Sequence, residues 1–172
     1  IYRWQFLVGK YLGTAVTMGV LMGFMALVFF AVLGLMGGGP RIVLLKAVWL
    51  YFIEVLVISA VALFFSSFSS PFLSGLFTLL IFVVGRLTAD LREIVSRVDE
   101  LWLTVLGKAA LYLTPDLHVF SVSGATVGGK WVSVHGEFVT FGYVAQATFY
   151  GLLYSTVVIL LAVMFFRRRD FV

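Results

Sequence analysis

The spacing of the charged residues constrains this chain most. Residues 11–40 and 138–166 contain no Asp, Glu, Lys or Arg, and residues 47–85 contain only Glu54. A helix that crosses the hydrocarbon core of a bilayer needs about 20 consecutive apolar residues. The first and last stretches are therefore each long enough for one membrane-spanning helix, and the middle stretch is long enough for two.

The break between the two middle helices is predicted at residues 66–71, which read Ser-Ser-Phe-Ser-Ser-Pro. Serine side chains can bond freed backbone groups, and Pro71 suits the first turn of a new helix. The three glycines and the proline at 37–40 would end the first helix. In chain order, the four predicted membrane spans cover about residues 12–36, 43–65, 72–88 and 143–166.

The composition excludes several classes of protein. Hydrophobic residues make up 62% of the chain and charged residues 12%, with a mean hydropathy of +1.12, whereas soluble domains contain about 45–50% apolar and 25% charged residues. A water-soluble globule and a disordered chain are both excluded. Because there is no cysteine, disulfides, cysteine-bound metals and thiol catalysis are excluded as well. We predict an all-α integral membrane protein that does not bind nucleic acid.

Residues 89–141 are more polar than the rest. Asp90 and Glu93 have the spacing of a capping box, in which the first turn of a helix is satisfied by side chains. Apolar residues then recur every three or four positions as far as Val105. This pattern predicts an amphipathic helix at the membrane interface or in a re-entrant position, and an ordered loop follows Pro115.

Four spans would place both ends of the chain on one side of the membrane. Arg3, Lys10 and the three arginines at 167–169 lie on that side, and basic residues favour the cytoplasm. Residues 89–141 are then extracytoplasmic. We expect a single transmembrane domain over residues 1–172. Since the sequence begins without Met or a signal-peptide pattern, we also expect it to be the C-terminal part of a longer protein.

Glu54 is the candidate polar site inside a span. An ionisable group there is costly, so it usually faces protein or water and often has a function. It could line a transport route or bind a proton, or its carboxylate could simply bond a neighbouring helix, with Tyr51 as a possible donor. Gln146, Tyr150 and Tyr154 form a polar and aromatic stripe in the last span, which could line a substrate path or be satisfied within the bundle.

Small residues recur at every fourth position in the first and last spans, where they allow close approach of helix backbones. We expect both sets to be helix-packing faces. The sets are Ala15, Gly19 and Gly23 in the first span, and Ala147, Gly151 and Ser155 in the last.

Two apparent motifs in the polar region do not predict chemistry. Residues 124–130 match G-x-x-x-x-G-K, but Trp131 follows where a phosphate-binding loop needs Ser or Thr. Four side chains could be imagined as metal ligands: Asp116, His118, His135 and Glu137. Their spacing matches no standard metal site, so neither nucleotide nor metal binding is predicted in this chain.

Four stretches together resemble the type-2 permease family of ATP-binding-cassette (ABC) transporters. The first reads R-W-Q-F-L-V-G-K-Y-L-G and resembles the segment that enters the third helix of the family. The others resemble its tight turn between the fourth and fifth helices, its extracytoplasmic L-P-N-L-x-x-F element and its F-R-R-R-D-F end. In order, the four stretches are residues 3–13, 64–71, 113–120 and 166–171.

The resemblance implies the last four helices of a six-helix permease in the bacterial inner membrane. It also implies two kinds of protein partner, a cytoplasmic ATP-binding subunit and a second permease copy or a paralogue, besides membrane lipids. Carried over onto this sequence, Arg3, Trp4, Phe6 and Lys10 are the candidates for coupling to the ATP-binding subunit. Arg3 and Lys10 could instead contact phospholipid headgroups or only set the topology.

The function that we expect is that of a non-enzymatic permease subunit of an ATP-driven exporter. Mg-ATP would bind to the partner subunit, and no cofactor is expected in this chain. The alternatives are a structural membrane subunit of a larger complex and an intramembrane enzyme that uses Glu54 or the polar group around His118. No charged stripe lines the spans, which favours a lipid-like or amphipathic substrate over a small ion.

Overall fold

The structure is a computed structural model of the 172-residue chain. It describes residues 3–37, 42–88, 91–92, 114–121, 126–127, 130–131 and 140–168. Most of the predicted amphipathic helix, which follows Asp90, lies outside the described residues. The predicted re-entrant or interfacial position of that region therefore stays a prediction.

Helices dominate the described residues. In chain order, the elements are α1 (Arg3–Leu35), α2 (Ile42–Ser66), α3 (Pro71–Arg86), the 3₁₀ helix η1 (Leu117–Phe120), the two-residue strands β1 (Thr126–Val127) and β2 (Lys130–Trp131), and α6 (Phe141–Arg168). Within the described ranges, α1, α2 and α6 are long and apolar enough to cross a membrane. The prediction of a helical membrane protein is confirmed at this level.

The predicted third span, at 72–88, is not confirmed as a crossing. α3 has 16 residues, which is about 24 Å of helix at 1.5 Å per residue. The hydrocarbon core of a bilayer is about 30 Å thick, so α3 alone is too short to cross it unless the bilayer thins locally. Its C-terminal end is instead packed against other parts of the protein.

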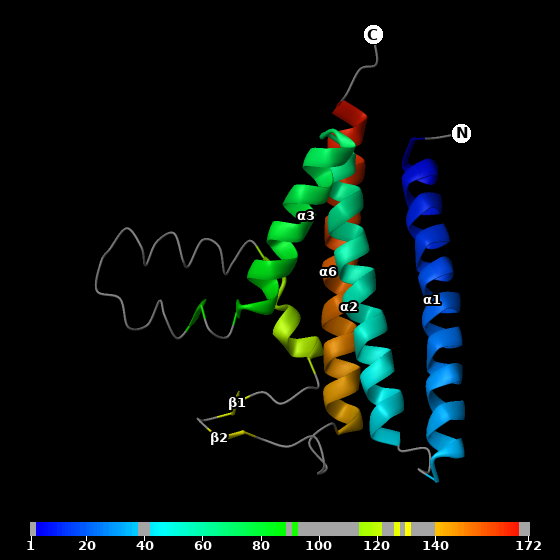
Figure 1. Cartoon of the computed structure of the whole chain (residues 1–172). Helices are drawn as coiled ribbons and strands as arrows, with labels where there is room; N and C mark the ends of the chain where they lie inside the picture. Colours follow the sequence, from blue (N-terminus) through cyan, green and yellow to red (C-terminus); the bar gives the residue numbers. More distant parts are fainter. Residues whose placement is uncertain are drawn as a thin grey trace.

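α2 is the central helix of the bundle (Figure 1). α6 packs along one side of α2, and α1 and α3 flank it on other sides. Both chain termini lie at the same end of the bundle, which we call the terminal end; the α2–α3 turn also lies there. The C-terminal end of α1 and the N-terminal end of α2 lie at the opposite end.

The core of the bundle forms where α2 meets α6 and η1. The side chains of Leu50, Ile53, Val57, Leu117 and Phe120 are almost completely buried in it. On α6, the predicted small-residue face lies against this core, which confirms its role in packing: all three of its residues, Ala147, Gly151 and Ser155, are buried. A Cβ atom on Gly151 would collide with the side chain of Ile53 and lie 3.1 Å from the ring of Phe120.

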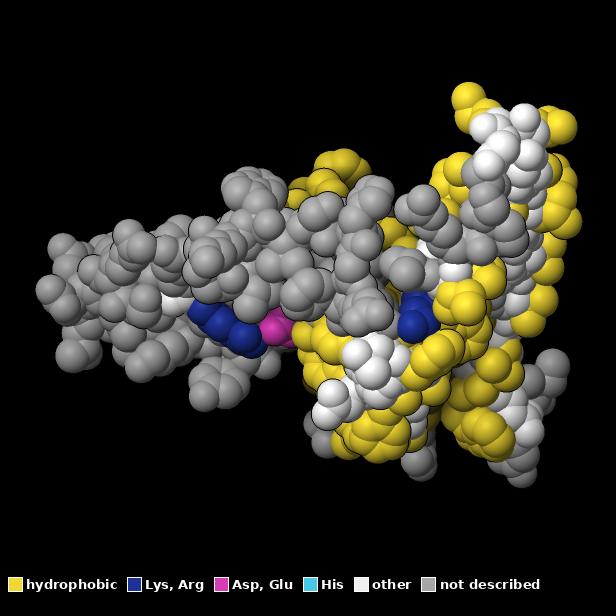
Figure 2. All heavy atoms as spheres, turned by 90° about the horizontal axis from the view of Figure 1, so that it is seen from below, with side chains coloured by type: hydrophobic (Ala, Val, Ile, Leu, Met, Phe, Trp, Pro, Cys, Tyr) yellow, Lys and Arg dark blue, Asp and Glu magenta, His cyan; other side chains and the backbone are white. Residues whose placement is uncertain are grey.

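α1 packs much more loosely than α6. Ala15 packs against the core, and a Cβ atom on Gly19 would lie 3.5 Å from the ring of Phe52, but one on Gly23 would meet nothing within 4 Å. Large apolar side chains such as Phe24 and Met25 are about two-thirds exposed. Figure 2, viewed from the end opposite the termini, shows hydrophobic side chains over the outer surfaces of the helices and few charged ones. Such a surface is suited to lipid or to another apolar helix.

The serine-rich segment forms the tight turn that the sequence predicts. α2 ends at Ser66 and α3 begins at Pro71, so that only four residues connect the helices. The Ser67 hydroxyl donates to the Phe64 carbonyl oxygen at 2.7 Å, and the Ser74 hydroxyl donates to the Ala62 carbonyl oxygen at 3.2 Å. These bonds fix the return of the chain along α2.

Candidate functional site

A buried ion pair joins the middle of α2 to the end of α3. Glu54 is the central residue of α2, about 18 Å from either end of that helix, and only 3% of it is exposed. Its Oε2 accepts a hydrogen bond from Nη2 of Arg86 at 3.1 Å, and its Oε1 lies 3.0 Å from Arg86 Nε. The second contact meets the distance of an ion pair but lacks the geometry of a hydrogen bond.

Arg86 has a well-defined environment beyond Glu54. Its guanidinium carbon lies 5.9 Å from the ring centres of both Tyr51 and Phe82, a range in which a cation is attracted to an aromatic face. Arg86 also belongs to the last turn of α3, where the helix dipole favours a positive charge. The partner of Glu54 is therefore Arg86, and Tyr51 contributes its ring to the partner instead of a hydrogen bond to the carboxylate.

The end of α3 is closed by side-chain and backbone contacts. The Thr88 hydroxyl lies 2.7 Å from the Gly85 carbonyl oxygen, to which it donates, and 3.3 Å from that of Val84. A Cβ atom on Gly85 would lie 2.8 Å from the Pro115 carbonyl oxygen and 2.9 Å from the Leu117 side chain. Glycine is therefore what allows the segment around η1 to pack directly on the end of α3.

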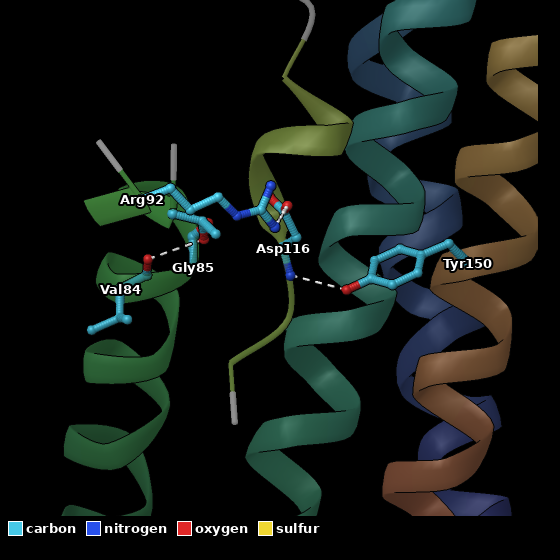
Figure 3. A network of polar contacts seen from close by, with 6 residues as sticks. Val84, Gly85, Arg92, Asp116 and Tyr150 are labelled. Atoms are coloured by element: carbon cyan, nitrogen blue, oxygen red, sulfur yellow. Dashed lines mark hydrogen bonds and ion pairs between the residues drawn. The ribbon is translucent and has the colours of Figure 1, made fainter. Parts of the chain in front are cut away.

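The segment 114–121 brings non-helical backbone into the bundle, and α6 satisfies part of it. The Asp116 backbone N–H donates to the Tyr150 hydroxyl at 3.0 Å (Figure 3), and the Tyr143 hydroxyl donates to the Val119 carbonyl oxygen at 2.6 Å. Arg92 Nη2 lies 2.8 Å from Asp116 Oδ2. Unpaired backbone groups are costly in an apolar environment, where a continuous helix would pair them internally. The bonds from α6 pair backbone groups of the η1 segment instead.

We call the two ion pairs and these tyrosine contacts the polar network. Its members come from α2, from α3 and the residues just after it, from the η1 segment and from α6. They are Glu54, Arg86, Arg92, Asp116, Tyr143 and Tyr150. The network pairs opposite charges and provides hydrogen-bond partners for backbone groups. Within the described residues, no three His, Cys, Asp or Glu side chains lie close enough together to hold a metal ion.

The structure separates the predicted stripe on α6. Tyr150 and Tyr154 are half-buried, with ring centres 6.2 Å apart, whereas Gln146 is exposed. Residues four apart on an α-helix differ by about 40° in direction, so residues eight apart differ by about 80°. Gln146 therefore points well away from Tyr154. Of the three residues, Tyr150 belongs to the polar network and Tyr154 lies beside it.

The candidate coupling residues lie at the start of α1, at the terminal end of the bundle and away from the polar network. Trp4 is 50% exposed and Phe6 is 60% exposed, and Lys10 is also exposed. Between them, Leu7 is buried and holds this turn of α1 against the bundle. Arg3 is the first residue of α1, and its side chain lies outside the described parts.

The motifs set aside in the sequence are placed only in part. Lys130 lies in β2, which pairs antiparallel with β1, so that Val127 faces Lys130 and Thr126 faces Trp131. A phosphate-binding loop would instead place this lysine at the start of a helix. His118 lies in η1 next to Asp116, whose carboxylate is bound by Arg92. His135 and Glu137 lie outside the described residues.

Sequence reasoning missed Arg86 and Arg92 as site residues. A signal for Arg86 was present: Glu54 needs a positive partner, and Arg86 is the first basic residue after it, at the end of the next predicted helix. No comparable signal exists for Arg92, because its pairing with Asp116 joins residues 24 positions apart in the sequence.

Comparison with known proteins adds no relative. The chain matches no family model, no curated protein and no solved structure. The functional assignment must therefore be argued from the residues and the geometry described above.

Proposed function

We propose that this chain is a permease subunit of an ATP-driven exporter, of the type-2 class found in ABC transporters. The observation that carries the transport part of the proposal is the ion pair of Glu54 with Arg86, halfway along an apolar bundle. Ionisable groups at such a depth are expensive and are typical of pathways for substrates or ions. The ABC part of the proposal depends on the sequence resemblance.

The form of the network supports transport over a purely structural role. Transporters often build their sites from helices that stop within the membrane, next to irregular backbone that is buried in protein. α3 ends at Arg86, beside the midpoint of α2, and the η1 segment packs against that end. This arrangement supports a path that passes near the end of α3.

The positions of the four resembling stretches support the ABC part of the proposal. They correspond to the start of α1, the α2–α3 turn, the segment that leads into η1, and the end of α6. The first, second and fourth stretches lie at the terminal end, where a cytoplasmic ATP-binding subunit could reach all three.

In this proposal, Arg3, Trp4 and Phe6 contact the ATP-binding subunit, whereas Lys10 lines a groove between α1, α2 and α3. That subunit binds Mg-ATP and closes on it, and the movement passes into α1 as a rigid-body shift. The exposure of Trp4 and Phe6 supports this role, since exposed aromatic side chains are typical anchors at interfaces. A second permease copy or a paralogue would complete the pathway in the bacterial inner membrane.

The test is purification of the full-length protein from native membranes in mild detergent. Bound proteins are identified by mass spectrometry, and hydrolysis of Mg-ATP is measured with and without vanadate. We expect a stoichiometric ATP-binding subunit and vanadate-sensitive turnover. Phe6→Ala should weaken the complex about tenfold or more, as for an interface hot spot, whereas Met36→Ala, at a more exposed apolar site just past the other end of α1, should not.

The other outcomes separate the alternatives. A stable complex without an ATP-binding subunit would overturn the proposal in favour of a structural membrane subunit. A preparation that turns over a substrate without any partner, and loses this activity in Glu54→Gln, would overturn it in favour of an intramembrane enzyme. Equal binding by the Phe6→Ala and Met36→Ala variants would remove Phe6 from the coupling surface.

A further inference from the structure

A groove opens on the side of the bundle between α1, α2 and α3. Its volume is about 600 Å³, within the range of pockets that hold small molecules. Lys10 from α1 and Ser66 and Pro71 from the α2–α3 turn line it near the terminal end, and Ile58 and Phe82 line it deeper in the bundle. None of these residues belongs to the polar network.

The groove has the length of one leaflet of a bilayer. Its wall on α3 extends from Pro71 to Phe82, about 16 Å of helix, and its wall on α2 extends from Ser66 to Ile58, about 12 Å. Half of a typical hydrocarbon core is about 15 Å. Ile58 and Phe82 are each one helical turn from a member of the buried ion pair, so the groove extends from the terminal end to the middle of the bundle.

Lys10 is the cationic group that lines the groove. Its side chain is exposed, and it has no ion pair with any described residue. Two hydroxyl groups of the wall have already donated their protons, from Ser74 to the Ala62 carbonyl oxygen and from Thr78 to the Ser74 carbonyl oxygen. The groove therefore offers one positive charge near the surface and a mainly apolar wall below it.

This combination fits a lipid better than a protein segment. A single acyl chain is thinner than a helix, which is 10–12 Å across, and it extends from the headgroup to the middle of the bilayer as the groove does. The phosphate of an anionic headgroup complements the ammonium group of Lys10.

We propose that this groove binds one acyl chain of an anionic phospholipid, from the leaflet on the side of the chain termini, with the lipid phosphate at Lys10. The site is a lipid-binding site of the protein itself, and it holds whether or not the chain is a transporter.

The first test compares two lysines at opposite ends of the bundle. The full-length protein is exchanged into detergent with added phosphatidylglycerol or phosphatidylcholine, and retained lipid is counted by native mass spectrometry. We expect preferential retention of one phosphatidylglycerol. Lys10→Gln should weaken it about fivefold, the size expected for one lysine near an anionic lipid surface. Lys46→Gln should leave it unchanged, because Lys46 lies 3.9 Å from the ring centre of Phe141, on α6 at the other end.

The second test fills the groove. Gly75 lines it, and a Cβ atom there would meet nothing within 4 Å, so Gly75→Leu should fold while it occupies the space of the acyl chain. We expect retention of phosphatidylglycerol to fall roughly tenfold or more, because packed space cannot hold the chain. Gly34→Leu is the matched control, since a Cβ atom on Gly34 is equally free and Gly34 does not line the groove.

Four results would overturn the proposal. The first is equal retention of the two lipids, and the second is a Lys10→Gln variant that binds like Lys46→Gln. The third comes from phosphatidylglycerol with a photoreactive acyl chain: if it labels α1 and α3 equally in the native protein and in Gly75→Leu, the chain does not lie in the groove. Finally, a copurifying protein that shields the groove from labelling would show that a protein, and not a lipid, occupies it.

Discussion

α1 and α6 are both long apolar helices, yet they pack in opposite ways. One face of α6 is buried against α2, where Ala147, Gly151 and Ser155 allow the backbones to approach closely. α1 has a similar row of small residues, but a Cβ atom on Gly23 would meet nothing within 4 Å, and the surrounding apolar side chains are exposed. The same sequence pattern therefore describes a filled interface in one helix and a largely open one in the other.

The difference teaches where the stability of the bundle resides. On the α2–α6 side, the small residues of α6 fit against the side chains of α2, and two tyrosines of α6 form hydrogen bonds with backbone groups of the η1 segment. An ion pair also holds α2 to α3. α1 is fixed mainly near its first half, where the Tyr11 hydroxyl donates to the Leu56 carbonyl oxygen at 3.3 Å and Leu7 is buried. Substitutions should therefore be costly on the α2–α6 side and mild on α1.

The largest effect is expected from breaking the ion pair. Glu54→Ala would leave Arg86 without its partner in an apolar environment, which for a buried pair costs about 3–5 kcal/mol. Since 31% of the Arg86 side chain is exposed, we expect about 3 kcal/mol of lost unfolding free energy. The measurement is reversible unfolding in mixed detergent micelles.

The matched control for the ion pair replaces both charges. Glu54→Leu combined with Arg86→Met should recover most of the loss, because apolar residues of similar volume often substitute for a buried pair without cost. A double variant as unstable as Glu54→Ala would show that the cost comes from lost packing and not from an unpaired charge.

An intermediate effect is expected from adding one methyl group to a glycine. Gly151→Ala places a Cβ atom against Ile53 and Phe120 and should cost about 1–3 kcal/mol of unfolding free energy through overpacking. Gly23→Ala meets open space on α1 and should be neutral or stabilising by up to about 1 kcal/mol, as alanine favours a helix. The same unfolding assay compares the two, and equal effects would contradict the contrast between α6 and α1.

The smallest effect is expected from a single hydroxyl group. Tyr150→Phe removes the acceptor of the Asp116 N–H and should cost about 1 kcal/mol, the usual scale of hydrogen bonds within membrane proteins. It should also speed amide exchange at Asp116, measured by hydrogen–deuterium exchange. Tyr154→Phe is the control, since the Tyr154 hydroxyl makes no hydrogen bond with any described residue; an equal response of both variants would exclude the bond as the cause.

Local patterns predicted the parts of this fold that depend on local physics. The long stretches with at most one charged residue predicted α1, α2 and α6. The serines and Pro71 predicted the turn between α2 and α3, and the small residues predicted the packing face of α6. Each of these follows from hydropathy, backbone chemistry or size within one segment. The same reasoning could not tell that the row of small residues on α1 would stay largely open.

The rest depends on residues that are distant in sequence. At the end of α3, Gly85 contacts Pro115 and Arg86 pairs with Glu54. Hydropathy contains no information about these contacts, and the span that it predicted continues to residue 88. Gln146 was grouped with the tyrosines of α6 by spacing, although the rotation of the helix turns it away. The candidate site was therefore predicted at Glu54 and Tyr150. Arg86 could have been recognised as the first basic residue after Glu54, but Arg92 could not.

The ion pair also has an electrical consequence. A single charge that moves through a membrane potential of 100 mV does work of about 2.3 kcal/mol. Arg86 and Glu54 carry opposite charges with their paired atoms 3.0 Å apart, so α2 and α3 can shift together along the membrane normal with almost no net displacement of charge. A movement that separates them would instead carry one charge past the other, and only then would the voltage across the membrane act on the bundle.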